Sequence, residues 1–284
     1  IIPVLVFVLP KIHLFLQDHI HIILLLAVLF LILKEKEKFQ TFLVFMMSGS
    51  LGLVALNMPN IREPLLPLLS GLFGVSSLIL SIKNNTNVPK QAEEKTKISL
   101  EKLKYVFIGT VSGIISAFLP GLGSSQLSVI SSSFIRKMES EDYLVLNSSI
   151  NSINLIGSFI TLYSIEKARN GIAVAISKII NDFDKKYLIL IIAVIFITLF
   201  LATFLTITFS KIFSKLITKI NYRKVCLFVI MFNITMVLLV SKPLGLLILT
   251  TATFLGIFTQ LKEINKNHLM GCLIIPVIIF FILN

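Results

Sequence analysis

Long apolar runs alternate with short polar segments along most of the chain. A helix that crosses a membrane needs about 20 predominantly apolar residues, and these runs have roughly that length. We therefore predict an all-α integral membrane protein with about eight transmembrane helices. The predicted spans are residues 12–33, 40–56, 64–82, 143–163, 187–209, 225–240, 243–259 and 268–283.

The composition agrees with a membrane environment. Hydrophobic residues make up 56% of the 284 residues and charged residues 14%, whereas soluble domains are roughly half apolar and a quarter charged. The net charge of +12 is spread over the connections between apolar runs and lacks interleaved aromatics, so no nucleic-acid partner is predicted. Cys226 and Cys272 lie in apolar runs without CxxC spacing, and no metal site is predicted from them.

Lysine-rich connections predict the orientation and the domain organisation. Residues 34–38, 83–104 and 211–224 are rich in lysine, and such loops usually face the cytoplasm. Residues 83–102 form the longest polar connection and are predicted to be a cytoplasmic linker. This linker would separate N-terminal transmembrane helices at residues 1–82 from a transport domain at residues 103–284.

Residues 103–135 are predicted to form a re-entrant hairpin. Basic residues precede and follow this segment, so both of its ends should face the cytoplasm. A single helix of this length would be about 50 Å long, too long for a hydrocarbon core of roughly 30 Å. We therefore expect two half-helices that are joined by a break near Pro120, because proline and the following glycines interrupt a helix.

The break is also the first candidate binding site. A half-helix that begins inside the membrane presents unpaired N–H groups and the positive end of its dipole, which suit a carboxylate. Hydroxyl and amide side chains follow the break and supply further donors. The candidate residues in this segment are Pro120, Gly121, Gly123, Ser124, Ser125, Gln126 and Ser128.

A second polar stripe lies on the next predicted helix. Asn147, Asn151 and Asn154 are spaced i, i+4 and i+7, and amides inside a membrane are costly unless they face a cavity or another helix. We predict that this stripe and the hairpin converge on one substrate cavity. Two alternatives stay open: plain interhelical hydrogen bonding by the amides, and close helix packing by the small residues of the hairpin.

The middle of the predicted spans contains no ionisable residue that would form a proton relay. Ion coupling would therefore use Na⁺ held by carbonyl and hydroxyl oxygens, and no other cofactor is predicted.

The sequence FLPGLGSSQ at residues 118–126 and SIEKARNGIAVAI at residues 164–176 resembles the large permease subunit of tripartite tricarboxylate transporters, the TctA family, in its archaeal form. The resemblance is best over about residues 103–180. It implies an inverted-repeat transporter with two broken hairpins, of which Pro120 to Gln126 would be the second. No first copy is evident, so we expect half or more of such a transporter, with its N-terminal repeat either missing or diverged beyond recognition. The resemblance also implies a small membrane subunit and a periplasmic-type binding protein as partners.

The leading hypothesis is a multi-pass permease, surrounded by membrane lipids, that moves small organic anions such as di- or tricarboxylates across the cytoplasmic membrane. A membrane enzyme that acts on lipid-linked substrates is the alternative. Its candidate residues, Glu139, Glu141 and Asp142, lack a histidine or a DxD-type spacing. A non-transporting assembly subunit is a third interpretation.

Overall fold

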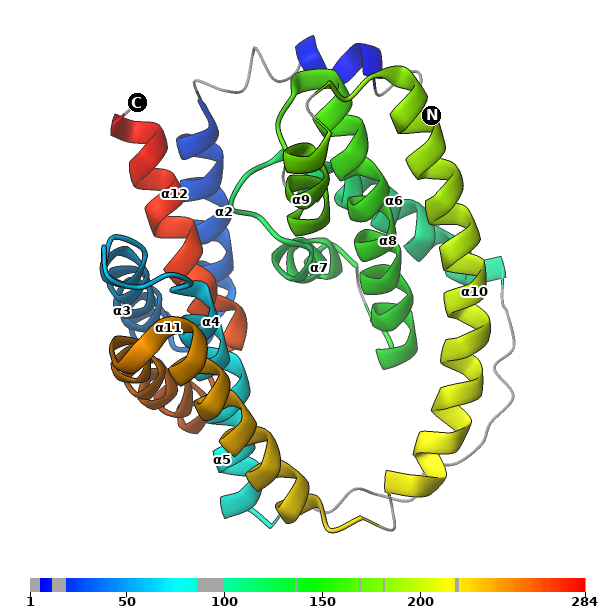
Figure 1. Ribbon diagram of the computed structural model, residues 1–284. Helices are drawn as coiled ribbons and strands as arrows, with labels where there is room; N and C mark the ends of the chain where they lie inside the picture. The colour runs from blue at the N-terminus through cyan, green and yellow to red at the C-terminus, as the bar shows by residue number, and fades with distance from the viewer. Residues whose placement is uncertain are drawn as a thin grey trace. The chain divides into compact units, whose positions relative to one another are not determined.

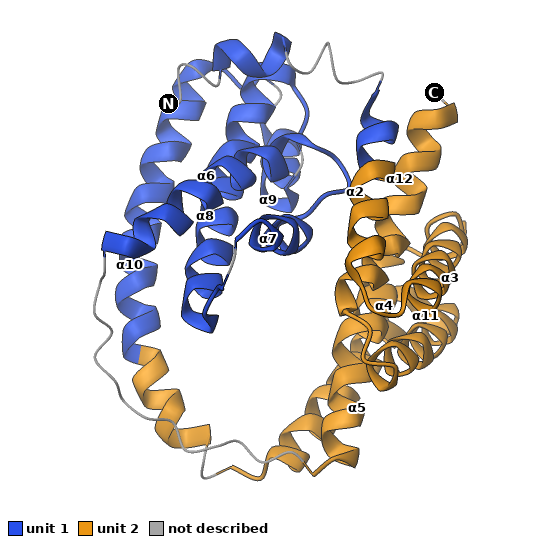
Figure 2. Ribbon diagram, turned by 180° about the vertical axis from the view of Figure 1, so that it is seen from behind, with its two compact units in different colours: residues 1–24, 94–208 blue, residues 25–93, 209–284 orange. Residues whose placement is uncertain are grey.

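The computed structural model describes residues 6–11, 19–85, 100–135, 137–168, 170–180, 182–217 and 220–283, and these residues contain helices and connecting turns without strands. Figure 1 follows the helices from the N- to the C-terminus, and Figure 2 shows that the chain forms two compact units, both discontinuous in sequence. Unit 1 comprises residues 1–24 and 94–208, and unit 2 comprises residues 25–93 and 209–284. The boundaries at residues 82 and 102 stay a prediction, and most of the predicted linker, residues 86–99, lies outside the described residues.

Six of the described helical segments are long and apolar enough to cross a membrane. Helix α2 (Ile20–Lys34) is apolar but shorter, and residues 12–18 of the predicted first span lie outside the described residues. Two predicted spans fall on the two halves of α11, which bends between them. The all-α membrane fold is therefore confirmed. The six segments are α3 (Lys38–Leu56), the continuous α4 (Leu65–Leu69) to α5 (Ser76–Lys83), α8 (Ser140–Ile165), α10 (Lys185–Ile217), α11 (Tyr222–Leu261), and residues Lys266–Leu283, which contain α12 (Gly271–Leu283).

Unit 2 is held together by closely packed helices. A π-helical segment, Ser70–Val75, joins α4 to α5 and packs on α11, while α3 packs on α12. Gly52 shows how closely α3 approaches α12, because a Cβ atom there would lie 2.0 Å from the carbonyl oxygen of Cys272. Small residues commonly allow such close approach between membrane helices. The core of this unit includes Leu68, Leu72 and Leu269, which are fully buried.

Helix α11 is sharply bent at Lys242. Its φ of 61° and ψ of −173° lie in a region that is essentially restricted to glycine, and such a conformation costs on the order of 1–3 kcal/mol. Pro243 follows, and it has no N–H to donate to the preceding turn. The hydroxyl of Ser241 donates to the carbonyl oxygen of Glu63 at 3.1 Å and thereby ties the bend to the loop between α3 and α4.

Unit 1 contains α6 (Leu103–Phe118), α7 (Ser124–Ser133), α8, α9 (Gly171–Ile179) and most of α10. Helices α6 and α8 make the most extensive contact of this unit, and α7 contacts both of them. Gly113 lies at the α6–α8 contact, where a Cβ atom would be 2.7 Å from Cβ of Ile153. The ends of α6 and α8 are further joined by an ion pair, with Lys102 Nζ 2.5 Å from Glu141 Oε2. The α6–α8 pair therefore supports α7.

Candidate functional site

The break between α6 and α7 lies where the sequence predicts it. Helix α6 ends at Phe118, and α7 begins at Ser124. Leu119 is extended, with φ −81° and ψ 123°, as expected for a residue before proline. Gly121 has φ 82°, a left-handed conformation that glycine adopts without strain. The predicted break near Pro120 is therefore confirmed, whereas the position of this hairpin in the membrane stays a prediction.

The N-terminus of α7 provides backbone donors. Its N-cap is Gly123, which has no side chain that accepts hydrogen bonds from the first turn. The N–H of Leu127 donates to the carbonyl oxygen of Gly123, and this is the first backbone hydrogen bond of the helix. The N–H groups of Ser124, Ser125 and Gln126 precede this bond and have no acceptor within the helix. They form the positive end of the α7 dipole.

Gln126 adds a buried side-chain donor to the first turn. Its side chain is 0% exposed, and its Nε2 atom has no hydrogen-bond partner among the described residues. The Oε1 atom accepts a hydrogen bond from Ser125 Oγ at 3.2 Å. A buried donor without an acceptor costs about 1–3 kcal/mol, and native structures seldom retain one without a reason. A ligand with an acceptor oxygen would remove this cost.

The asparagine stripe of α8 contacts both parts of the broken helix. Ser128 Oγ on α7 lies 2.7 Å from Asn147 Oδ1 and also 2.7 Å from the carbonyl oxygen of Ser124, so its single hydrogen is donated to one of them. Asn154 Nδ2 donates to Ser116 Oγ on α6. Asn147 and Asn154 are half-buried. The structure therefore brings the two predicted polar faces together.

The remaining predicted residues differ in their surroundings. Asn151 is exposed, and its amide donates to the carbonyl oxygen of Asn147 within the same helix. Ser125 is also exposed, whereas Pro120, Gly121, Gly123 and Ser124 are half-buried. Direct hydrogen bonds between the helices account for part of the polar stripe. The role of all these residues in substrate binding stays a prediction.

Sequence reasoning missed the polar face of α6. Ser112 Oγ lies 2.6 Å from Ser131 Oγ of α7, and Ser116 Oγ lies 3.4 Å from the carbonyl oxygen of Leu122 in the break. Both side chains are buried. Their spacing with Gly109 and Gly113, at i, i+3, i+4 and i+7, is one helical face and was the signal available in the sequence.

No charged residue occurs between residues 105 and 133. The electrostatic field at the break therefore comes from backbone and side-chain dipoles. Lys102 lies just before α6, and its hydrogen bond to Glu141 raises the pKa of Lys102 above the ordinary value of 10.5. A dipolar site of this kind can hold an anion without a fixed counter-charge.

A broken helix whose second half presents uncharged donors, within a multi-pass helical membrane protein, is typical of the class of secondary transporters. The chain matches the sequence profile of the Tripartite tricarboxylate transporter TctA family over residues 1–271, and it belongs to that family. The resemblance stated from residues 118–126 and 164–176 is thus confirmed. This family is a family of transporters, which argues against the alternative of a membrane enzyme that acts on lipid-linked substrates.

An uncharacterized protein of the archaeon Methanocaldococcus jannaschii is 26% identical over 268 residues. The alignment covers 92% of this chain and 66% of that relative, so the chain spans slightly less than two thirds of the relative's length. No solved structure matches this chain.

Proposed function

We propose that this chain is the permease part of a secondary transporter for small organic anions with two or three carboxylates, located in the plasma membrane. The observation that carries the proposal is the buried Gln126 Nε2 donor in the first turn of α7, which has no partner among the described residues. This donor and the free N–H groups of the same turn can receive one carboxylate together. Family membership supports the class of substrate.

The neutral character of the site favours reversible binding. Residues 105–133 have no lysine or arginine that would form a strong ion pair with a carboxylate. A di- or trivalent anion is then compensated only in part by the roughly half unit of charge at a helix N-terminus. We propose Na⁺ as the coupling ion, because Asn147 Oδ1 and the Ser124 carbonyl oxygen both lie 2.7 Å from Ser128 Oγ, and such oxygen atoms suit a hard cation.

We also propose that the chain works in a tripartite assembly. The family takes its name from transporters of three components. A small membrane subunit and a soluble binding protein are therefore the expected partners, and the binding protein would deliver the anion to the permease. Copurification from its own membranes with a tagged chain would test this assembly.

The binding test uses the full chain in detergent, with citrate and succinate as probes and with NaCl replaced by choline chloride in a parallel series. Bound anion should raise the unfolding temperature in a saturable manner, because a ligand that binds only the folded state stabilises it. Gln126→Leu should weaken citrate binding about 10- to 100-fold, since a hydrogen bond to a charged group contributes about 1.5–3 kcal/mol.

Gln260→Leu is the matched control. Gln260 is a half-buried glutamine of α11 whose Nε2 atom donates to Ser76 Oγ and to the Gly256 carbonyl oxygen. Its substitution should lower stability but leave the affinity for citrate unchanged. Gln126→Leu should instead leave the ligand-free protein as stable as the parent or more so, because it removes an unpaired buried donor. Unchanged citrate affinity in Gln126→Leu would refute the proposed site.

A further inference from the structure

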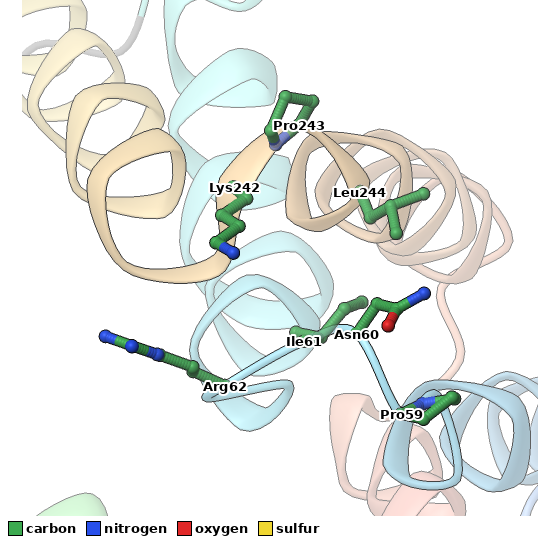
Figure 3. Close-up of a pocket in the computed structure, with 7 residues that line it drawn as sticks. All are labelled: Pro59, Asn60, Ile61, Arg62, Lys242, Pro243 and Leu244. Atoms are coloured by element: carbon green, nitrogen blue, oxygen red, sulfur yellow. The ribbon is translucent and has the colours of Figure 1, made fainter.

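A basic pocket of about 540 Å³ lies in unit 2, where the loop between α3 and α4 meets the bend of α11 (Figure 3). We call it the bend pocket. Two cations from separate segments, Arg62 of the loop and Lys242 of the bend, line it together. Its lining residues are Pro59, Asn60, Ile61, Arg62, Lys242, Pro243 and Leu244.

The two cations have no acidic partner in the part of the chain that the structure describes: neither Arg62 nor Lys242 forms an ion pair with an acidic side chain there. The side chain of Lys242 extends from the bend toward the loop that carries Arg62 (Figure 3). The Ser241 hydroxyl holds the bend to that loop through the Glu63 carbonyl oxygen. The two walls that carry Lys242 and Arg62 are thus tied to each other, and both residues line the same pocket.

The backbone of Lys242 is strained at the bend. With φ at 61° and ψ at −173°, the residue occupies a conformation that glycine would adopt far more easily. The half of α11 that begins at Pro243 adds the positive end of a long helix beside the same pocket.

The bend pocket lies where apolar segments end. Helix α3 ends at Leu56 and α4 begins at Leu65, on either side of the loop. Each half of α11, residues 222–241 and 243–261, is about 30 Å long, which matches one membrane crossing. The bend and the loop therefore belong at a membrane surface. The most abundant anion at that depth is the phosphate group of a polar lipid.

Exposed apolar side chains lie at the start of α4 and at the start of the second half of α11, which adjoin the lining residues in sequence. Leu65 of α4 is 40% exposed, and Leu244 and Leu247 of α11 are 44% and 58% exposed. The acyl or isoprenoid chain of a lipid can lie on such a surface while the phosphate group of the same lipid occupies the bend pocket. We propose that the bend pocket binds the phosphate group of an anionic membrane lipid, with Arg62 and Lys242 as its ligands.

The test uses the full chain in detergent micelles with dioleoyl phosphatidylglycerol as the probe, and bound lipid is counted by native mass spectrometry. Arg62→Gln and Lys242→Gln should each weaken the binding of phosphatidylglycerol about fivefold. One basic residue near an anionic lipid surface contributes about 1 kcal/mol of attraction, which corresponds to about that change in affinity. Lys262→Gln is the matched control, since Lys262 is an exposed lysine just beyond the other end of α11. It should leave the affinity unchanged.

A second variant separates binding from folding. Lys242→Gly removes the charge and also relieves the strained backbone, so it should raise the unfolding temperature of the lipid-free protein while it lowers lipid affinity about fivefold. Lys242→Arg should keep the affinity. A merely structural role of Lys242 would change stability and affinity in the same direction.

Three results would overturn the proposal. If the double variant Arg62→Gln, Lys242→Gln binds phosphatidylglycerol like the parent, these residues hold no lipid phosphate. If glycerol 3-phosphate or citrate binds the bend pocket as tightly as phosphatidylglycerol, and with the same dependence on both residues, the occupant is a soluble anion. Equal binding of phosphatidylcholine and phosphatidylglycerol would likewise exclude recognition of an anionic lipid.

Discussion

Substituting Gly113 by alanine should push α6 away from α8. The added Cβ atom would lie 2.7 Å from Cβ of Ile153 and 2.9 Å from the carbonyl oxygen of Ile150, and real Cβ atoms essentially never approach closer than 3.0 Å. Both neighbours belong to or adjoin the backbone of α8, so neither can rotate away. The helices must move apart by at least 0.3 Å, the difference between 3.0 and 2.7 Å.

The expected free-energy change has two parts of opposite sign. Overpacking of a tight contact costs typically about 1–3 kcal/mol, whereas alanine is better than glycine in a helix by about 0.5–1 kcal/mol. Gly113→Ala should therefore lower the free energy of unfolding by about 1 kcal/mol. Gly74→Ala is the control, because no atom of another described helix lies within 4 Å of a Cβ atom at Gly74. Its free energy of unfolding should rise by the difference in helix propensity between alanine and glycine, with no cost of overpacking.

Reversible unfolding in mixed micelles of detergent and dodecyl sulfate measures both variants under the same conditions. The two identical substitutions should differ by about 2 kcal/mol, with opposite signs relative to the parent. A Gly113→Ala protein as stable as the Gly74→Ala protein would refute the close contact between α6 and α8. Since α6 leads directly into the break at Leu119, citrate affinity should fall in Gly113→Ala and stay unchanged in Gly74→Ala.

Two further predictions concern other contacts. Gly52→Ala should destabilise unit 2 by about 3 kcal/mol, because its Cβ would lie 2.0 Å from the Cys272 carbonyl oxygen; the same unfolding assay measures it, and parental stability would contradict the packing. The hydrogen bond to Glu141 raises the pKa of Lys102 above 10.5, so its stabilising contribution is complete below pH 10.5 and is lost as the pH rises through the higher folded value. The free energy of unfolding, measured from pH 9 to 12, should show this loss in the parent but not in Lys102→Met. Identical pH profiles of the two proteins would exclude a stabilising contribution of Lys102.

The membrane fold and the broken helix were predictable because they depend on local sequence. An apolar run of about 20 residues has few alternatives to a membrane helix. Pro120 removes a backbone donor, and Gly121 readily adopts the positive φ that the break requires. These effects act within a few residues, so the sequence pattern alone reveals them.

The contacts of the site were less predictable because they join distant residues. The asparagine spacing indicated one polar face of α8, but nothing in it identified Ser116 as the partner of Asn154. The exposure of Asn151 also depends on which neighbours cover α8. The strained Lys242 was missed for another reason: two apolar runs around a proline indicate a turn, but they do not reveal which residue adopts the unusual backbone conformation.

The absence of charge between residues 105 and 133 has an electrical consequence for transport. If the binding segment of a carrier has no positive side chain, that segment supplies no counter-charge to the bound anion. The full negative charge of the anion then crosses the membrane unless cations accompany it. Each uncompensated negative charge that enters a cell with an interior-negative potential of 100 mV must be driven uphill by about 2.3 kcal/mol. The number of cations that accompany each anion therefore decides whether uptake generates a current, and a tricarboxylate needs three monovalent cations to cross without one.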